Sequence, residues 1–132
     1  MQFDQFIGLV QHRAQLSSEG KALTATKATL EVLGERLFGG EASDFAAQLP
    51  LELKSYVIQF ESGQSFDLEE FFGRISDREG VDIDEAMRHA RAVLSVVAEA
   101  VSYGEIEDAL AQLPEEWHYL FRHWGETIRK AA

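Results

Sequence analysis

Apolar residues recur along the chain at spacings of three and four, and no stretch alternates between apolar and polar positions with a period of two. Spacings of three and four place side chains on one face of an α-helix, whereas alternation would place them on one face of a strand. Two comparable stretches carry the pattern through Phe3, Phe6, Ile7, Val10 and Ala14, and through Leu68, Phe71, Phe72 and Ile75. The pattern predicts an all-α protein.

A longer helix is expected after each of these stretches. Its apolar positions are Ala22, Thr26, Leu30, Leu33 and Leu37 in one case, and Ala86, Ala90, Leu94, Val97 and Val101 in the other. Ser17 and Asp82 are suitable N-cap residues for the two long helices, and Asp67 is suitable for the helix through residues 68–75. Gly39-Gly40 and Tyr103-Gly104 are expected to end the long helices, because glycine readily adopts the left-handed conformation beyond a helix C-terminus.

Gly34 stands inside the first long helix, where glycine costs up to about 1 kcal/mol relative to alanine. A close crossing with another helix would explain this residue. The matching position in the second long helix holds Ala98, which is also small.

The sequence repeats itself at a shift of 64 positions. Seven of the eleven residues from Gly40 to Pro50 are identical to those from Gly104 to Pro114, in the pattern GE-x2-D-x3-QLP. We therefore expect one domain over residues 1–132, made of repeats 1–64 and 65–132 with four helices each. A unit of about 65 residues buries a smaller share of its surface than a longer chain does. The two repeats are thus expected to pack together as one pseudo-twofold bundle.

The repeated AQLP sequence is expected to form a joint between two helices. Proline lacks an N–H and disfavours helical geometry in the residue before it, but it suits the first turn of a new helix. A short helix should therefore end near Gln48 or Gln112, and another should begin near Pro50 or Pro114. We expect the amides of both glutamines to bond backbone groups left unpaired at the joint.

Four duplicated carboxylates precede these joints, at Glu41, Asp44, Glu105 and Asp108. In the first turn of a short helix they would be stabilised by the positive end of the helix dipole. If the two repeats bring them together, the four acids would instead hold a hard cation or raise a pKa. This alternative predicts a metal-binding or small-ligand-binding protein, with an enzyme as its extension.

Composition excludes several classes of function. The 132 residues carry a net charge of −11, and the second half is the more acidic, so direct binding to nucleic acid is not expected. No apolar run approaches the roughly 20 residues that cross a bilayer, and no export leader opens the chain, so a cytoplasmic protein is expected. The absence of cysteine removes thiolate chemistry, and no cofactor motif is present.

Other candidate sites have weaker support. Glu115 and His118 form a Glu-x-x-His pattern, but the first repeat has Leu51 and Lys54 at these places, which argues against a di-metal bundle. His118 and His123 are five residues apart and point to different sides of a helix. His12 and His89 are expected to be solvated.

The last helix of the second repeat is rich in aromatic residues. Trp117, Phe121 and Trp124 are spaced as a helical core stripe, which is the favoured interpretation, whereas Tyr119 falls off this stripe. Large aromatics also dominate interface energetics, so Tyr119, Trp117 and Trp124 are candidates for interaction. The favoured function is a non-enzymatic interaction module that binds a protein partner or a second copy of itself.

Four stretches of the chain resemble a bacterial family, the domain of unknown function numbered 2267. They are FDQFIGLVQHR, TLEVLGERLFGGEASDFAAQLPLEL, FDLEEFFGRI and ARAVLSVVAEAVSYGEIEDALAQLPEEW. The resemblance covers nearly the whole chain, and the paired GE-x2-D-x3-QLP segments are its most specific part. It implies an all-helical duplicated domain, and it implies no activity, substrate or catalytic residue.

Overall fold

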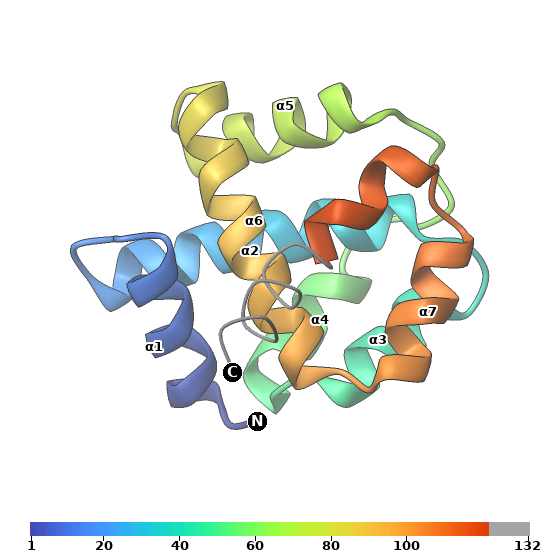
Figure 1. Cartoon of the computed structure of the whole chain (residues 1–132), viewed down its shortest axis with the longest axis horizontal. Helices are drawn as coiled ribbons and strands as arrows, with labels where there is room; N and C mark the ends of the chain where they lie inside the picture. The colour runs from blue at the N-terminus through green and yellow to red at the C-terminus, as the bar shows by residue number, and fades with distance from the viewer. Residues whose placement is uncertain (122–132) are drawn as a thin grey trace.

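The computed structural model describes residues 1–121, and every regular element in this range is a helix (Figure 1). The predicted all-α class is therefore confirmed. The elements are α1 (Phe3–Arg13), α2 (Glu19–Arg36), α3 (Glu41–Gln48), α4 (Leu51–Ile58), α5 (Leu68–Glu79), α6 (Ile83–Ala100), α7 (Tyr103–Ala111) and the 3-10 helix η1 (Glu115–Trp117). Within the same range, no helix is long and apolar enough to cross a membrane. The pseudo-twofold relation between repeats 1–64 and 65–132 stays a prediction.

The helix starts follow local capping chemistry. Asp67 accepts a hydrogen bond from Glu70 N at 2.9 Å, and Asp82 accepts one from Glu85 N at 2.9 Å, as predicted. The start of α2 was predicted one residue too early, because Ser18 and not Ser17 is the N-cap and accepts from Lys21 N at 3.1 Å. Ser17 and Ser18 have the same side-chain capping chemistry, so the sequence does not distinguish them. In the structure, the extended backbone of Ser18 identifies it as the N-cap.

Tyr103 and Gly104 do not end the second long helix, which corrects the prediction for this segment. Helix α6 ends at Ala100, and Val101 adopts an extended conformation. Ser102 then caps α7 by accepting a hydrogen bond from Glu105 N at 3.3 Å. The serine cap thus starts α7 at Tyr103. Tyr103 and Gly104 consequently lie in the first turn of α7 and do not end α6.

Helix α2 lies at the centre of the fold and packs against α1, α4, α5 and α6 (Figure 1). Leu30 and Leu33 are fully buried in it. Gly34 faces α4 so closely that a Cβ added there would lie 1.8 Å from the carbonyl oxygen of Val57. The close helix crossing predicted from Gly34 is confirmed.

Two of the predicted stripe residues, Trp117 and Phe121, enter the core. Trp117 is fully buried, with its ring centroid 4.8 Å from that of Phe71 and 6.3 Å from that of Phe66. Phe121 is also buried, which confirms the core stripe for these two residues. Trp124 and His123 lie outside the described residues.

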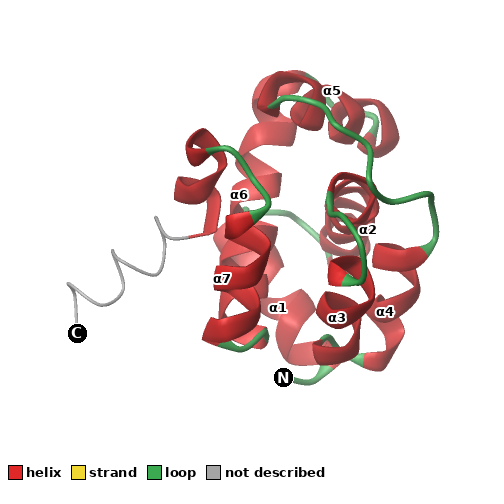
Figure 2. Cartoon of the chain, turned by 90° about the vertical axis from the view of Figure 1, so that its right-hand side faces the viewer, coloured by secondary structure: helices red, strands yellow, loops and turns green. Residues whose placement is uncertain are grey.

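Both AQLP joints separate helices at the predicted place. Helix α3 ends at Gln48 and α4 begins after Pro50, while α7 ends at Ala111 and η1 begins after Pro114. Leu49 and Leu113 are buried beside the joints. The joints bring α3 and α7 side by side at one end of the molecule, at the right of Figure 1 and at the front of Figure 2.

Candidate carboxylate site

Glu41 opens α3 after a tight turn. Helix α2 ends at Arg36 with Leu37 as an extended C-cap residue, so Gly39-Gly40 do not end it as predicted. Gly39 has a φ of +59°, and Gly40 is the N-cap of α3. A φ of this sign is strained for residues with a Cβ, so glycine at position 39 allows the chain to reverse here. The Glu41 side chain is consequently turned inward, and the residue is only 8% exposed.

Glu105 and Asp108 project from one face of α7, because residues three apart are neighbours on a helix. Glu105 lies in the first turn, next to the Ser102 cap. Asp108 lies a turn later, although the sequence predicted it in the first turn. The difference arises because α7 begins at Tyr103, two residues before the position that matches the start of α3.

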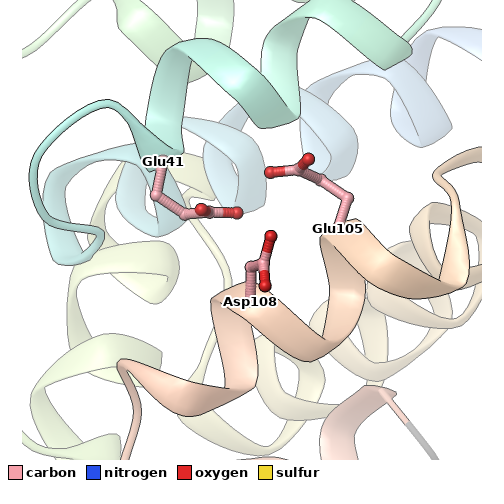
Figure 3. Close-up of side chains that lie close together, drawn as sticks. All are labelled: Glu41, Glu105 and Asp108. Carbon is pink, nitrogen blue, oxygen red and sulfur yellow. The ribbon is translucent and has the colours of Figure 1, made fainter.

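Three of the four duplicated acids meet where α3 packs against α7. One carboxylate oxygen from each of Glu41, Glu105 and Asp108 lies within 4.8 Å of the others. Figure 3 shows the three side chains pointing toward one another, Glu41 from α3 and the other two from α7. Asp44 is exposed and is not part of this group. We call Glu41, Glu105 and Asp108 the carboxylate cluster.

The pKa of Glu41 is raised from its ordinary 4.5 to about 8, and burial is the largest cause. A side-chain hydrogen bond with Glu105 and repulsion from the charges of Glu105, Asp108 and Asp44 contribute to the same rise. A positive helix N-terminus favours an ionised carboxylate. Here burial and neighbouring negative charge outweigh that effect, and Glu41 is protonated at neutral pH.

The cluster has hydrogen-bonding capacity that the described residues do not use. Glu41 Oε1 and Glu105 Oε1 are buried, and neither accepts a hydrogen bond from any group in residues 1–121. Only Glu105 Oε2 has an amide donor, Gln48 Nε2, at 3.5 Å. A buried acceptor without a partner costs about 1–3 kcal/mol. Three carboxylates with unused oxygens suit a hard cation, whereas zinc sites use mostly nitrogen and sulfur ligands.

The two joint glutamines connect the halves of the chain around the cluster. Gln48 Oε1 accepts a hydrogen bond from Ser102 N at 2.6 Å. Gln112 binds the backbone of Phe38 twice, accepting from its N at 2.9 Å and donating to its O at 3.1 Å. The amides therefore bond backbone groups, as predicted, but these groups belong to the opposite half and not to the glutamine's own joint.

The other aromatic and histidine candidates have different surroundings. Tyr119 is 38% exposed, and its hydroxyl accepts a hydrogen bond from Arg91 Nη2 at 3.3 Å. His118 Nε2 is placed to donate to Leu110 O at 2.9 Å and to Leu113 O at 3.2 Å. Backbone carbonyls thus engage the ring nitrogen that the Glu-x-x-His pattern would have offered to a metal.

His89 is buried, which corrects the expectation that it is solvated. It is 3% exposed, and its Nδ1 contacts Glu79 Oε1 across the turn between α5 and α6. Burial raises the pKa of Glu79, and His89 acts in the opposite direction. A sequence signal existed for His89, because Ala86, His89 and Val93 are spaced three and four apart and share the buried face of α6. His12 is exposed, as expected.

The family of the chain follows from its match to a family model. Residues 3–120 match the model described as "Uncharacterized conserved protein (DUF2267)". No curated protein matches the chain. The match spans the carboxylate cluster, both glutamines and the buried Trp117, and the chain belongs to the DUF2267 family of uncharacterized conserved proteins.

Proposed function

We propose that this protein binds a hard divalent cation at the carboxylate cluster, with Ca²⁺ as the best fit. The observation that carries the proposal is Glu41, which is more than nine-tenths buried, has an unpartnered oxygen, and points toward two further carboxylates. A cation would displace the proton of Glu41, offset the charges of Glu105 and Asp108, and remove the cost of the unpartnered oxygens.

The spacing of the oxygens is compatible with one bound Ca²⁺. Two oxygens on opposite sides of one Ca²⁺ lie about 4.8 Å apart, since each bond is roughly 2.3–2.6 Å long. The three cluster oxygens lie within 4.8 Å of one another. Mg²⁺ requires shorter bonds of about 2.0–2.1 Å and near-ideal octahedral geometry. Three carboxylates supply fewer ligands than a dedicated high-affinity loop, so we expect a Kd on the order of 10⁻⁴ M.

The cation would connect the two halves of the chain, because Glu41 precedes residue 64 and the other two ligands follow it. The glutamines support a pseudo-twofold arrangement around this point. Gln48 and Gln112 are 64 positions apart, and so are their backbone partners Ser102 and Phe38. We propose that the duplication created a cation site shared between the repeats.

Thermal unfolding with and without Ca²⁺ tests the proposal. At 100 times the Kd, a ligand that binds only the folded state adds about 2.7 kcal/mol of stability. We expect 10 mM Ca²⁺ to raise the Tm by several degrees, and this increase to disappear in Asp108→Asn. Asp77→Asn is the matched control, because Asp77 is an exposed acid on α5 that is outside the cluster and does not act on the pKa of Glu41. Its calcium-induced increase should equal that of the unmodified protein.

The comparison uses the calcium-induced change in Tm and not the Tm itself. Neutralising Asp108 also removes repulsion from Glu41, so the variant is expected to be at least as stable as the unmodified protein without calcium. Isothermal calorimetry with Ca²⁺, Mn²⁺ and Mg²⁺ gives the affinities directly. An unmodified protein that takes up none of these cations at 10 mM would contradict the proposal, and so would an equal loss in Asp77→Asn.

A second candidate is a non-enzymatic interaction module that binds a second copy of the chain. It is favoured by an apolar strip on α4, where Leu51 is 79% exposed and Ile58 is 53% exposed. These residues are seven apart and share one face of the helix. Light scattering over a concentration series tests the idea, with Leu51→Ser and Tyr119→Ala separating the two exposed surfaces. A monomer at all concentrations would rule out self-association.

A further inference from the structure

A pocket beside the end of α1 is lined mainly by arginines, in a strongly acidic chain. Its volume is about 320 Å³, and its lining residues are Arg13, Asp84, Met87, Arg88, Arg91 and Ala92. All except Arg13 come from α6, at spacings of three and four that define one face of the helix. Three positive charges therefore face one aspartate in this pocket, whereas the whole chain has a net charge of −11.

Arg88 and Arg91 are not held by direct ion pairs, although Arg88 lies close enough to the buried Glu79 for its charge to lower the pKa of that carboxyl against the effect of burial. Neither forms an ion pair with an acidic side chain in the part of the chain that the structure describes. Arg74 and Arg78, by contrast, each form an ion pair with Glu35. The buried carboxylate of Glu35 accompanies those two arginines, whereas the acid that lines the pocket, Asp84, forms no ion pair with Arg88 or Arg91 within residues 1–121.

Neutral groups hold both guanidinium groups in place. Arg88 Nη1 donates a hydrogen bond to the carbonyl of Ala14. The guanidinium of Arg91 lies 5.4 Å from the centre of the Tyr119 ring, and its Nη2 donates to the Tyr119 hydroxyl at 3.3 Å. Each contact leaves most of the five N–H donors of the arginine unused. The charges are thus positioned in advance, which lowers the ordering cost of binding an anion.

Arg13 forms part of the fixed wall. Its guanidinium forms an ion pair with Glu99 and donates a hydrogen bond to Ser95 Oγ at 3.0 Å, so contacts within the fold hold it in place. Met87 and Ala92 provide the apolar surface of the pocket. Asp84 stands in the first turn of α6 and offers an acceptor for a hydroxyl or amino group.

We propose that this pocket binds a small soluble phosphomonoester. Arginine matches phosphate geometry through paired N–H donors, and two arginines without direct ion pairs match the charge of a dianion. The apolar side of the pocket would contact the organic part of the ester. A volume near 320 Å³ falls at the small end of known ligand sites, which favours a ligand of few carbon atoms. The site is separate from the carboxylate cluster and does not depend on cation binding.

Calorimetry with glycerol 3-phosphate and with inorganic phosphate, at constant ionic strength, tests the proposal. We expect saturable binding of the ester with a Kd on the order of 10⁻³ M, and weaker binding of inorganic phosphate, which lacks the organic part. Arg91→Gln should weaken ester binding at least tenfold. Arg91 is exposed and contacts the exposed Tyr119, so this variant should fold normally.

Two further variants make the result specific. Lys21→Gln removes one exposed positive charge from α2, outside the pocket, and should leave ester binding unchanged. Arg91→Lys keeps the charge but loses the paired donors, so it should bind more weakly than the unmodified protein. Equal weakening in Lys21→Gln, or no saturable binding of the ester at 20 mM, would overturn the proposal. Binding to phosphatidate vesicles without binding to the soluble ester would overturn it as well.

Discussion

Replacing Gly34 with alanine tests the central helix crossing. The added Cβ would lie 1.8 Å from the carbonyl oxygen of Val57, 2.7 Å from its carbonyl carbon and 3.2 Å from its Cα. All three atoms belong to the backbone of α4, so no side-chain rotation relieves the overlap. Ordinary contact begins near 3.4 Å, and α2 and α4 would have to separate locally by roughly 1.5 Å.

Two opposing effects set the magnitude. Alanine improves helix propensity by about 1 kcal/mol relative to glycine. Overpacking of a tight core costs typically about 1–3 kcal/mol, and backbone overlap as severe as this belongs at the upper end. We therefore expect Gly34→Ala to lower the free energy of unfolding by about 2 kcal/mol, which corresponds to a fall in Tm of roughly 6–10 °C for a domain of this size.

Gly8→Ala and Gly73→Ala are matched controls. Both glycines lie inside helices, α1 and α5, and an added Cβ at either position meets no atom within 4 Å. Without an overlap only the propensity effect remains, so each control should be more stable by about 0.5–1 kcal/mol. Urea unfolding of the three variants measures these differences. A Gly34→Ala protein as stable as its controls would refute the argument for a close crossing.

Two other predictions concern the carboxylate cluster and its surroundings. Glu41 has a pKa of about 8 in the folded protein against an ordinary 4.5, because of burial and the neighbouring Glu105, Asp108 and Asp44. Its contribution to stability is therefore complete below about pH 4.5 and is lost as the pH rises to 8, with a slope of at most about 1.4 kcal/mol per pH unit. Urea unfolding between pH 5 and 9 should show this slope in the free energy of unfolding, and Glu41→Gln should lack it. Gln112→Ala removes two hydrogen bonds to Phe38 and should cost about 1–2 kcal/mol, with faster hydrogen exchange at the Phe38 amide, whereas Gln5→Ala at an exposed position should change neither.

Sequence patterns were most informative where the interactions are local. The caps at Asp67 and Asp82 join residues three positions apart, so both partners are visible in a short stretch of sequence. The same reasoning misassigned Tyr103 and Gly104, because it considered the conformational freedom of glycine and not the competing serine cap at Ser102. Local signals of similar strength then predict different boundaries, and tertiary packing decides between them.

The carboxylate cluster shows why a repeated motif does not specify a site. The motif treats Asp44 and Asp108 as equivalent, yet only Asp108 joins Glu41 and Glu105. Which acids meet depends on how α3 packs against α7 and on where each helix begins, and neither quantity is encoded in the spacing of the acids. The sequence therefore supplied the candidates, and the packing of the two helices selected three of the four.

Burial of polar residues was the least predictable property. His89 has polar neighbours in the sequence, but Glu79 reaches it from the preceding helix. Arg36 is likewise 5% exposed, and its guanidinium lies 5.2 Å from the centre of the Trp117 ring. The partners that make such burial tolerable are distant in sequence, and apolar periodicity gives no signal for them.

The bonds between Gln112 and Phe38 also set an order for completing the fold during synthesis. A ribosome that has released Phe38 must add 74 more residues before Gln112 exists. Throughout that interval Phe38 N lacks its partner Gln112 Oε1, Phe38 O keeps only the local hydrogen bond from Glu41 N, and the turn before α3 lacks its final support. The N-terminal half of the protein is thus finished by one of the last segments to be made, so a nascent chain stalled before Gln112 would keep this turn open to proteases and chaperones.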